Sequence, residues 1–419
     1  MKKLVALLLA LCMVACIFAA CGEAEPATEA PVDTEAPVDT EATVDTEATL
    51  ETEAPAADYS AWRVAMITDY GDITDESFNQ ATYEGGKAWC EERGVDFTYF
   101  KPTGDSTAER VAQIDAAVAD GYNVLLMPGF AFAGAIVETQ DLYPDVYFIA
   151  LDVSEYDIED AFYNHDEDGN RTDLIDPANE PHVCENVFSA VYQEELAGYM
   201  AGVAAVKLGY TELGFLGGMA VPAVVRYGYG FVQGANDAAA ETGAEVNVKY
   251  VYGNQFFGDA DITAYMDTWY ADGTQVVFAC GGGIYSSAAE AAAKVDGAKV
   301  IGVDVDQAAT IDAYGEGMTV TSAMKGLAAT VKTLLAELIE NDNWAEYSGK
   351  VTTLGLVSAD DPSANYVQLP DSTQWADGFT ADDYAALVAA LYNGEITVSA
   401  DIEAEPAVDI AVDYQGNIK

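Results

Sequence analysis

The apolar positions of this chain form short runs that are separated by longer amphipathic stretches. Residues 75–93 and 105–120 carry apolar side chains at helical spacing, and Gly94 stands where the first of these helices should stop. The short runs are rich in β-branched and aromatic residues, and most end at Gly or Asp, which predicts strands. Because strands and helices alternate, we predict βαβ units, parallel sheets and an α/β fold. The predicted strands are 62–68, 96–100, 123–129, 146–152, 212–218, 247–253, 275–281 and 299–305.

The ends of these predicted strands are where we expect a ligand to bind. In open α/β sheets, ligands bind beyond the carboxyl ends of the strands, where loops and helix N-termini meet. The stretch from Asp69 to Asn79 is one such loop, and we expect its helix to begin at about Thr74 or Asp75. It places carboxylates, the ring of Phe78 and the amide of Asn79 next to one another.

The first residues of the chain resemble a secretory signal. Two lysines precede an apolar run from Leu4 to Ala20, and small residues lead to Cys21. We therefore predict a lipoprotein signal peptide over 1–20, lipidation of Cys21 and an extracytoplasmic protein that is lipid-anchored to the cell membrane. A retained membrane anchor, or cleavage before Cys16, are the alternatives.

The segment that follows has low complexity. Within 21–58, six-residue units of the type Thr-Glu-Ala-Pro-Val-Asp repeat with no aromatic and no basic residue. Such a segment buries too little apolar surface to offset its chain entropy, so we predict a disordered, extended tether. Residues 59–419 are long enough for two domains.

The net charge of the chain is strongly negative and excludes some partners. The total of −54 includes +2 from the two lysines near the start and −12 from acidic residues of 22–58, which leaves −44 on residues 59–419. Nucleic acid is therefore not expected as a partner, because little positive charge is available to neutralise phosphates. The same field repels anionic ligands, whereas a neutral ligand does not feel it.

Several catalytic and metal-binding patterns are absent or incomplete, so we expect no enzyme, no cofactor and no metal. Both histidines lie within 154–182, a polar segment that interrupts the alternation of strands and helices, and no Gly-x-Ser-x-Gly turn occurs. A catalytic Ser-His or Cys-His site is therefore not expected. Residues 166–173 are similar to a calcium loop, but the required Gly is replaced by Arg171, and a hairpin turn at Asp168-Gly169 is the better interpretation. The glycines of 281–283 only approach a dinucleotide fingerprint. The spacing of Cys90, Cys184 and Cys280 fits no zinc motif, and we expect buried thiols.

Seven successive motifs resemble signatures of the basic membrane protein family, the purine-nucleoside-binding lipoproteins of ABC importers. The resemblance extends over most of residues 59–402. The motifs are ITDYGDITDESFNQATYEG, VLLMPGFAFAGAIVETQDLYPDVYFIALD, NVFSAVYQEELAGYMAGVAA, GFLGGMAVPAVVRYGYGFVQGA, VIGVDVDQ, TSAMKG and NGEITVSADI.

The resemblance implies a type I periplasmic-binding-protein fold, with two doubly wound parallel-sheet lobes joined by a three-strand hinge. It also implies that the protein takes up a nucleoside and passes it to an ABC permease driven by its ATPase. The expected division of the chain assigns 59–187 plus 320–350 to lobe 1, 188–319 plus 351–405 to lobe 2, and 406–419 to a C-terminal tail.

Roles for individual residues follow from the resemblance. Phe78 should stack on one face of the base, and Asn79 should hydrogen-bond its edge. Phe257, with Phe256 as the next choice, should cover the other face. The ribose should be held by Asp304, Lys325 and the backbone of the glycine loop around Gly282. Asp69 and Asp152 end strands in the same cleft and are further candidates for polar contacts.

Three alternatives stay open from the residues. The first is a receptor for a sugar or a signalling molecule on the same fold, since sugars also stack on aromatic rings. The second is a surface nucleoside hydrolase that uses clustered carboxylates. The third is an acidic surface protein without a ligand. The length of the 154–182 segment also leaves the exact ligand open.

Overall fold

The computed structural model describes residues 58–69 and 71–419, so the predicted signal peptide, Cys21 and nearly all of the tether lie outside the described residues. The eight predicted strands are all present, within one or two residues of their predicted bounds. The predicted helices are present as α1 (Phe78–Arg93) and α2 (Thr107–Ala119). Gly94 ends α1 in a left-handed conformation with φ of 68°, as its position predicts. No helix within 58–69 and 71–419 has the length and apolar character needed to cross a membrane.

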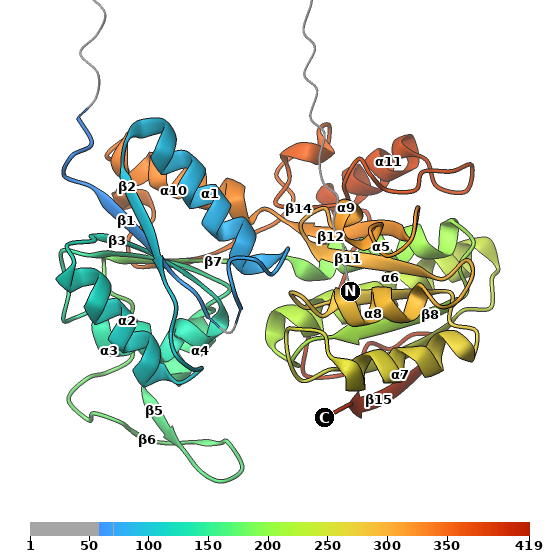
Figure 1. Cartoon of the computed structure of the whole chain (residues 1–419), viewed down its shortest axis with the longest axis horizontal. Helices are drawn as coiled ribbons and strands as arrows, with labels where there is room; N and C mark the ends of the chain where they lie inside the picture. The colour runs from blue at the N-terminus through green and yellow to red at the C-terminus, as the bar shows by residue number, and fades with distance from the viewer. Residues whose placement is uncertain (1–57, 70) are drawn as a thin grey trace, which may run out of the picture. The chain divides into compact units, whose positions relative to one another are not determined.

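The first sheet has six parallel strands in the order β13-β7-β4-β3-β1-β2. Figure 1 shows α1 and α10 (Leu327–Ile339) on one of its faces and α2, α3 (Ala133–Thr139) and α4 (Glu155–Asp160) on the other. The strands are β1 (Arg63–Ile67), β2 (Asp96–Phe100), β3 (Val124–Pro128), β4 (Tyr147–Leu151), β7 (Val187–Tyr192) and β13 (Lys350–Leu354).

The second sheet has seven strands in the order β14-β12-β11-β10-β8-β9-β15, and only β14 runs antiparallel to its neighbour. Helices α7 (Ala260–Ala271) and α8 (Tyr285–Ala292) pack on one face, and α5 (Glu194–Lys207) and α6 (Pro222–Thr242) pack on the other. The strands are β8 (Glu212–Gly217), β9 (Asn247–Tyr252), β10 (Val276–Cys280), β11 (Lys299–Asp304), β12 (Thr319–Lys325), β14 (Val367–Gln368) and β15 (Ala411–Asn417). Two short helices complete this part, α9 (Ala308–Ile311) and α11 (Ala381–Tyr392).

Helices α5 and α6 lie in direct backbone contact. A Cβ atom on Gly198 of α5 would stand 2.1 Å from the carbonyl oxygen of Tyr227 in α6, a distance that no side chain tolerates. Glycine is therefore required for this close approach, which brings Glu194 and Arg226, near the starts of the two helices, together.

The chain crosses between the two sheets three times, a few residues later than the predicted boundaries. β7 still belongs to the first sheet, so the first crossing follows Tyr192. β12 belongs to the second sheet, so the second crossing follows Lys325, and β13 returns the chain to the first sheet as far as Leu354. The predicted boundaries at 187/188, 319/320 and 350/351 are thus wrong, because each crossing lies at the end of a strand and not at its start.

Two peripheral segments have defined structure. Residues 406–419, which we expected to be a tail, contain β15, and this strand pairs in parallel with β9 at the edge of the second sheet. Within 154–182, β5 (Tyr163–His165) and β6 (Arg171–Leu174) form an antiparallel hairpin. Its turn includes Gly169 with φ of 81°, and the pairing of the two strands confirms the predicted hairpin.

Candidate functional site

A pocket lies where the carboxyl ends of strands from both sheets converge. The space free of protein atoms there is about 800 Å³, a figure that includes open solvent at the mouth of the pocket. Of the eight predicted ligand-binding residues, seven line it: Asp69, Phe78, Asn79, Asp152, Gly282, Asp304 and Lys325.

The loop that follows β1 is held by its own carboxylates. Asp69 accepts hydrogen bonds from the backbone N–H of Gly71 and from Asn79 Nδ2, each at 3.0 Å. Asp75 accepts from the backbone N–H groups of Ser77, Asn79 and Gln80, so its carboxylate caps the start of α1. The helix therefore begins at Phe78, later than predicted, because Asp75 stands before the first turn and not in it.

This network fixes the side-chain amide of Asn79. Its Nδ2 donates to Asp69 and Asp75, and its Oδ1 is buried without a hydrogen-bond partner among the described residues. A buried acceptor without a partner costs free energy until a donor reaches it. Asn79 is also one of the residues that line the pocket.

Lys325, at the end of β12, is surrounded by three carboxylates. Its Nζ lies 2.6 Å from Asp152 Oδ2, 3.1 Å from Glu194 Oε1 and 4.0 Å from Asp304 Oδ1. The lysine side chain is only 2% exposed. A second cation, Arg226, binds Glu194 Oε2 through Nε at 2.6 Å. Two cations therefore face three carboxylates in a space where charge is poorly solvated.

The environment of these groups shifts their pKa values in opposite directions. Burial raises the pKa of Asp152 to about 7 against the opposing effect of Lys325. Burial also raises the pKa of Asp304, although Lys325 and a hydrogen bond from Ser77 oppose it. Burial lowers the pKa of Lys325, but the three carboxylates outweigh it and the pKa stands above its ordinary value. For Glu194, burial is outweighed by Lys325 and Arg226, so the pKa is lowered and the group stays charged.

Asp152 and Asp304 hold matching positions in the two sheets. Asp152 directly follows β4 and Asp304 ends β11, and both have left-handed backbones, with φ of 60° and 65°. Such conformations are uncommon for residues other than Gly and gather at functional sites. Ser77 Oγ donates to Asp304 Oδ2 at 2.6 Å, whereas Asp152 Oδ1 is buried with no hydrogen-bond partner among the described residues.

Phe78, Tyr227 and Phe256 supply aromatic rings to the pocket lining, alongside aliphatic side chains. The ring centroid of Phe78 lies 5.0 Å from Lys325 Nζ, and those of Tyr192 and Tyr227 lie 5.3 Å and 5.5 Å from it, within cation–π range. Phe256 lines the pocket from the loop after β9, whereas Phe257 is 59% exposed and does not line it. The first choice of Phe257 for this wall is therefore wrong in this structure, and the second choice takes its place.

The loop that includes Gly282 explains this choice between the two rings. The backbone N–H of Gly283 donates to the carbonyl oxygen of Phe256 at 2.9 Å, and Phe257 forms an isolated bridge with Gly283. This pairing holds the two loops together, with Phe256 on the pocket side. Gly281 and Gly282 have φ of 155° and 55°, so the glycines allow a backbone that other residues rarely adopt.

Three residues of the site were not found by sequence reasoning. Glu194 and Arg226 form the ion pair behind Lys325. Tyr227 is buried and lines the pocket, and its hydroxyl has no hydrogen-bond partner among the described residues. Arg226 is an isolated basic residue in an apolar helix start, which is the one signal that could have drawn attention to this pair.

Two further acidic residues near the strand ends stabilise loops. Asp72 pairs with Lys101, and Asp306 accepts from the Ala308 N–H and from Ser372, so both carboxylates support loops. Cys90 and Cys280 are buried as expected, whereas Cys184 is half-buried.

A family model and individual relatives both relate this chain to substrate-binding proteins of ABC transporters. Residues 62–360 match the Bmp family, described as PnrA-like ABC transporter substrate-binding proteins. The chain is 28% identical over 257 residues to the ABC transporter nucleoside-binding protein BmpA of Lactococcus lactis subsp. cremoris, which covers 58% of this chain and 64% of that protein. It thus spans a little less than two thirds of that relative's length. It is 24% identical over 299 residues to basic membrane protein B of Borreliella afzelii, covering 70% of this chain and 78% of that protein.

Among solved structures, an ABC transporter solute-binding protein from Conexibacter woesei superimposes with a TM-score of 0.59 at 20% identity. The superposition covers 81% of this chain and 98% of that one. At this identity the likeness shows the fold alone, and it confirms the predicted α/β, type I periplasmic-binding-protein fold.

Proposed function

This chain belongs to the Bmp family of PnrA-like ABC transporter substrate-binding proteins, and from that premise we propose that it captures a purine nucleoside in the pocket between its two sheets and delivers it to an ABC permease. Proteins of this family bind a substrate for a transporter and are not enzymes. The observation that carries the choice of ligand is a set of buried acceptors without partners, next to aromatic rings.

The charge of the pocket supports a neutral ligand that donates hydrogen bonds. Asp152 Oδ1 and Asn79 Oδ1 lack hydrogen-bond partners among the described residues; the amide oxygen accepts, and the Asp152 carboxylate accepts when it is ionised. A nucleoside supplies ribose hydroxyls and base N–H groups as donors. A nucleotide would bring its phosphate toward the carboxylates of Asp69, Asp152 and Asp304, which would repel it.

The proposed pose follows the shape of the pocket. The base lies between the rings of Phe78 and Phe256, with Asn79 Oδ1 accepting from its edge. Stacking contributes about 1–3 kcal/mol per base face. The ribose lies toward Asp304, Asp152 and the backbone of Gly282. Lys325 Nζ donates one hydrogen bond, to Asp152 Oδ2, and lies in ion-pair contact with Glu194, so an N–H donor remains for a ribose oxygen.

The membrane attachment is part of the same proposal. We place the lipid on Cys21, with 21–58 acting as a tether that holds the binding domain away from the membrane surface. The permease and its ATPase are the expected partners, and the protein works outside the cytoplasm.

Ligand-dependent thermal melting tests this function. The panel includes adenosine, guanosine, inosine, cytidine, uridine, ribose and free adenine, because a ligand that binds only the folded state must raise the Tm. We expect purine nucleosides to raise the Tm more than pyrimidine nucleosides, and ribose alone to have little effect. A protein already loaded from the cell is recognised by denaturing it and identifying the released small molecule. Ribose or another sugar raising the Tm as much as the nucleosides would contradict the proposal.

A further inference from the structure

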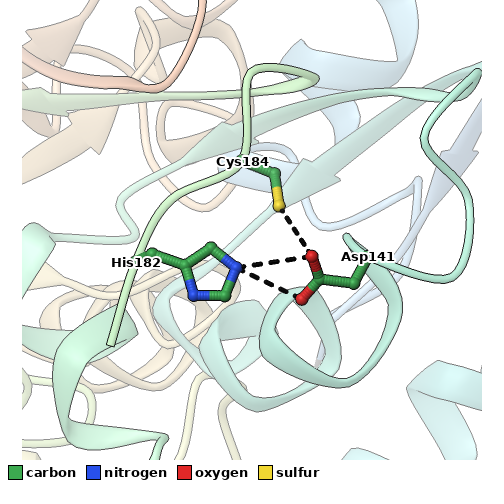
Figure 2. A group of neighbouring side chains, drawn as sticks. All are labelled: Asp141, His182 and Cys184. Atoms are coloured by element: carbon green, nitrogen blue, oxygen red, sulfur yellow. Dashed lines mark hydrogen bonds and ion pairs between the residues drawn. The ribbon is translucent and has the colours of Figure 1, made fainter. Parts of the chain in front are cut away.

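Three side chains with different ligating atoms gather on the first lobe, apart from the pocket. Asp141 follows α3, and His182 and Cys184 lie in the segment that leads into β7 (Figure 2). His182 Nε2 lies 3.2 Å from Asp141 Oδ2, and Cys184 Sγ lies 3.3 Å from Asp141 Oδ1. One nitrogen, one sulfur and one oxygen thus stand within 4.8 Å of one another. None of the three residues lines the nucleoside pocket.

The imidazole of His182 is oriented by a second hydrogen bond. Its Nδ1 lies 2.8 Å from the carbonyl oxygen of Glu180. A carbonyl oxygen can only accept, so Nδ1 carries the hydrogen and Nε2 is the nitrogen that faces Asp141 and Cys184. Histidines that bind metals are usually held in this way, with the other ring nitrogen donating to a carbonyl or carboxylate.

A buried amide holds the backbone of the two downstream ligands. Gln140 is fully buried, and its Oε1 accepts from the Cys184 N–H at 2.9 Å while its Nε2 donates to the His182 carbonyl at 3.2 Å. Gln140 is also the neighbour of Asp141 in the chain. One side chain therefore fixes the distance between the segment 182–184 and the third ligating residue, so the cluster is built before any ion arrives.

A simple ion pair between His182 and Asp141 would account for only part of this arrangement. It leaves unexplained why a thiol points at the same carboxylate. Among the described cysteines, Cys184 is the one that is not buried. The side chains of His182 and Asp141 are 37% and 52% exposed, so solvent reaches the cluster.

We propose that Asp141, His182 and Cys184 form a zinc-binding site with a fourth position open to water. Zinc accepts imidazole nitrogen, thiolate sulfur and carboxylate oxygen in one tetrahedral site, whereas calcium and magnesium prefer oxygen ligands alone. On binding, the Cys184 S–H bond breaks, the sulfur ligates the ion and the proton passes to solvent. The ion would join the end of α3 to the segment after the β5–β6 hairpin, and so stabilise the base of that hairpin.

Zinc titration of the full chain against a competing chromophoric chelator tests the site. We expect one ion per chain, with affinity reduced at least about tenfold in each of Asp141→Asn, His182→Gln and Cys184→Ser. His165→Gln is the matched control, because His165 lies in the hairpin, outside the cluster, and pairs with Asp160 at the end of α4. It should bind zinc as the parent does.

Cobalt gives a readout that depends on the thiol. Co²⁺ bound to the parent should show a thiolate-to-metal charge-transfer band, and this band should be missing in Cys184→Ser. Melting without metal verifies that each variant is folded. Unchanged zinc affinity in Cys184→Ser or in His182→Gln would overturn the three-ligand site. The site would also be overturned if His165→Gln lost as much zinc affinity as His182→Gln, or if the parent bound no zinc. Nucleoside binding should be unaffected in every variant.

Discussion

Lys325 and Asp152 form a buried ion pair that joins the two sheets of this protein. Lys325 ends a strand of the second sheet, Asp152 follows a strand of the first, and 2.6 Å separates Nζ from Oδ2. The pair therefore lies in the pocket where both sheets contribute their strand ends. Both the charge of the pocket and this contact between the two sheets therefore depend on the same ion pair.

Removing the lysine should destabilise the fold strongly. Lys325→Met leaves the buried carboxylates of Asp152 and Asp304 without their main counter-charge, which typically costs about 3–5 kcal/mol. Denaturant unfolding measures this loss. Lys294→Met is the control, because the exposed pair of Lys294 with Asp267 contributes about 1 kcal/mol or less. The double variant Lys325→Met/Asp152→Asn should recover part of the stability, and equal losses in Lys325→Met and Lys294→Met would contradict this reasoning.

Two neighbouring phenylalanines should differ in their effect on nucleoside binding. Phe256→Ala should weaken binding by about 1–3 kcal/mol, roughly 5- to 150-fold, because a stacking face is lost. Phe257→Ala should leave the affinity nearly unchanged, since this ring is 59% exposed. Phe78→Ala should behave like Phe256→Ala. Titration calorimetry with one nucleoside compares the three, and a larger loss in Phe257→Ala than in Phe256→Ala would reverse the assignment.

Asp304 should select for the sugar part of the ligand. Asp304→Asn keeps the left-handed backbone, which Asn tolerates, but replaces one acceptor oxygen by a donor. We expect weaker binding of nucleosides with little change for the free base. Asp306→Asn is the control, because Asp306 supports its own loop through Ala308 and Ser372. Equal losses for base and nucleoside in Asp304→Asn would argue against a ribose contact.

Glu195 should make stability depend on pH. Burial raises the pKa of this carboxyl from 4.5 to about 7. Between about pH 4.5 and pH 7 the folded chain therefore binds more protons than the unfolded chain. The contribution of Glu195 to the free energy of unfolding is present below about pH 4.5 and is lost as the pH rises through about 7. The loss amounts to at most about 3 kcal/mol.

The variant Glu195→Gln removes this titration. The Tm of the variant relative to the parent should rise between pH 5 and pH 8, whatever fixed cost the amide has at pH 5. Glu84→Gln, an exposed change on α1, is the control for replacing a glutamate by glutamine. A constant difference in Glu195→Gln would show that this carboxyl does not titrate in the folded chain within this range.

The lipid anchor can be tested outside the described residues. Cys21→Ser should prevent lipidation and release the protein from the membrane fraction. Cys16→Ser should leave it membrane-bound, because Cys21 is the predicted acceptor. Fractionation followed by mass spectrometry of the N-terminal peptide reads out both variants, and release by Cys16→Ser alone would move the lipid to Cys16.

The fold class, the positions of eight strands and the loop from Asp69 to Asn79 were predictable from the amino-acid sequence alone. These features depend on local patterns: apolar runs of strand length, helical spacing between them and polar residues at strand ends. The fold-level rule for open α/β sheets then placed the ligand at those ends. Seven of the eight expected ligand residues line the pocket; the individual roles proposed for most of them came from the family resemblance and not from these patterns.

Contacts between distant segments set which charged groups meet and which of two adjacent rings lines the pocket. Glu194, Arg226 and Lys325 meet because glycines allow α5 and α6 to touch, and no local pattern records that contact. Phe256 faces the pocket because its loop pairs with the glycine loop after β10, whereas strand alternation says nothing about a loop. Burial and pairing are properties of the packed molecule, since a side chain acquires its solvent exposure and its partners only when segments far apart in the chain come together.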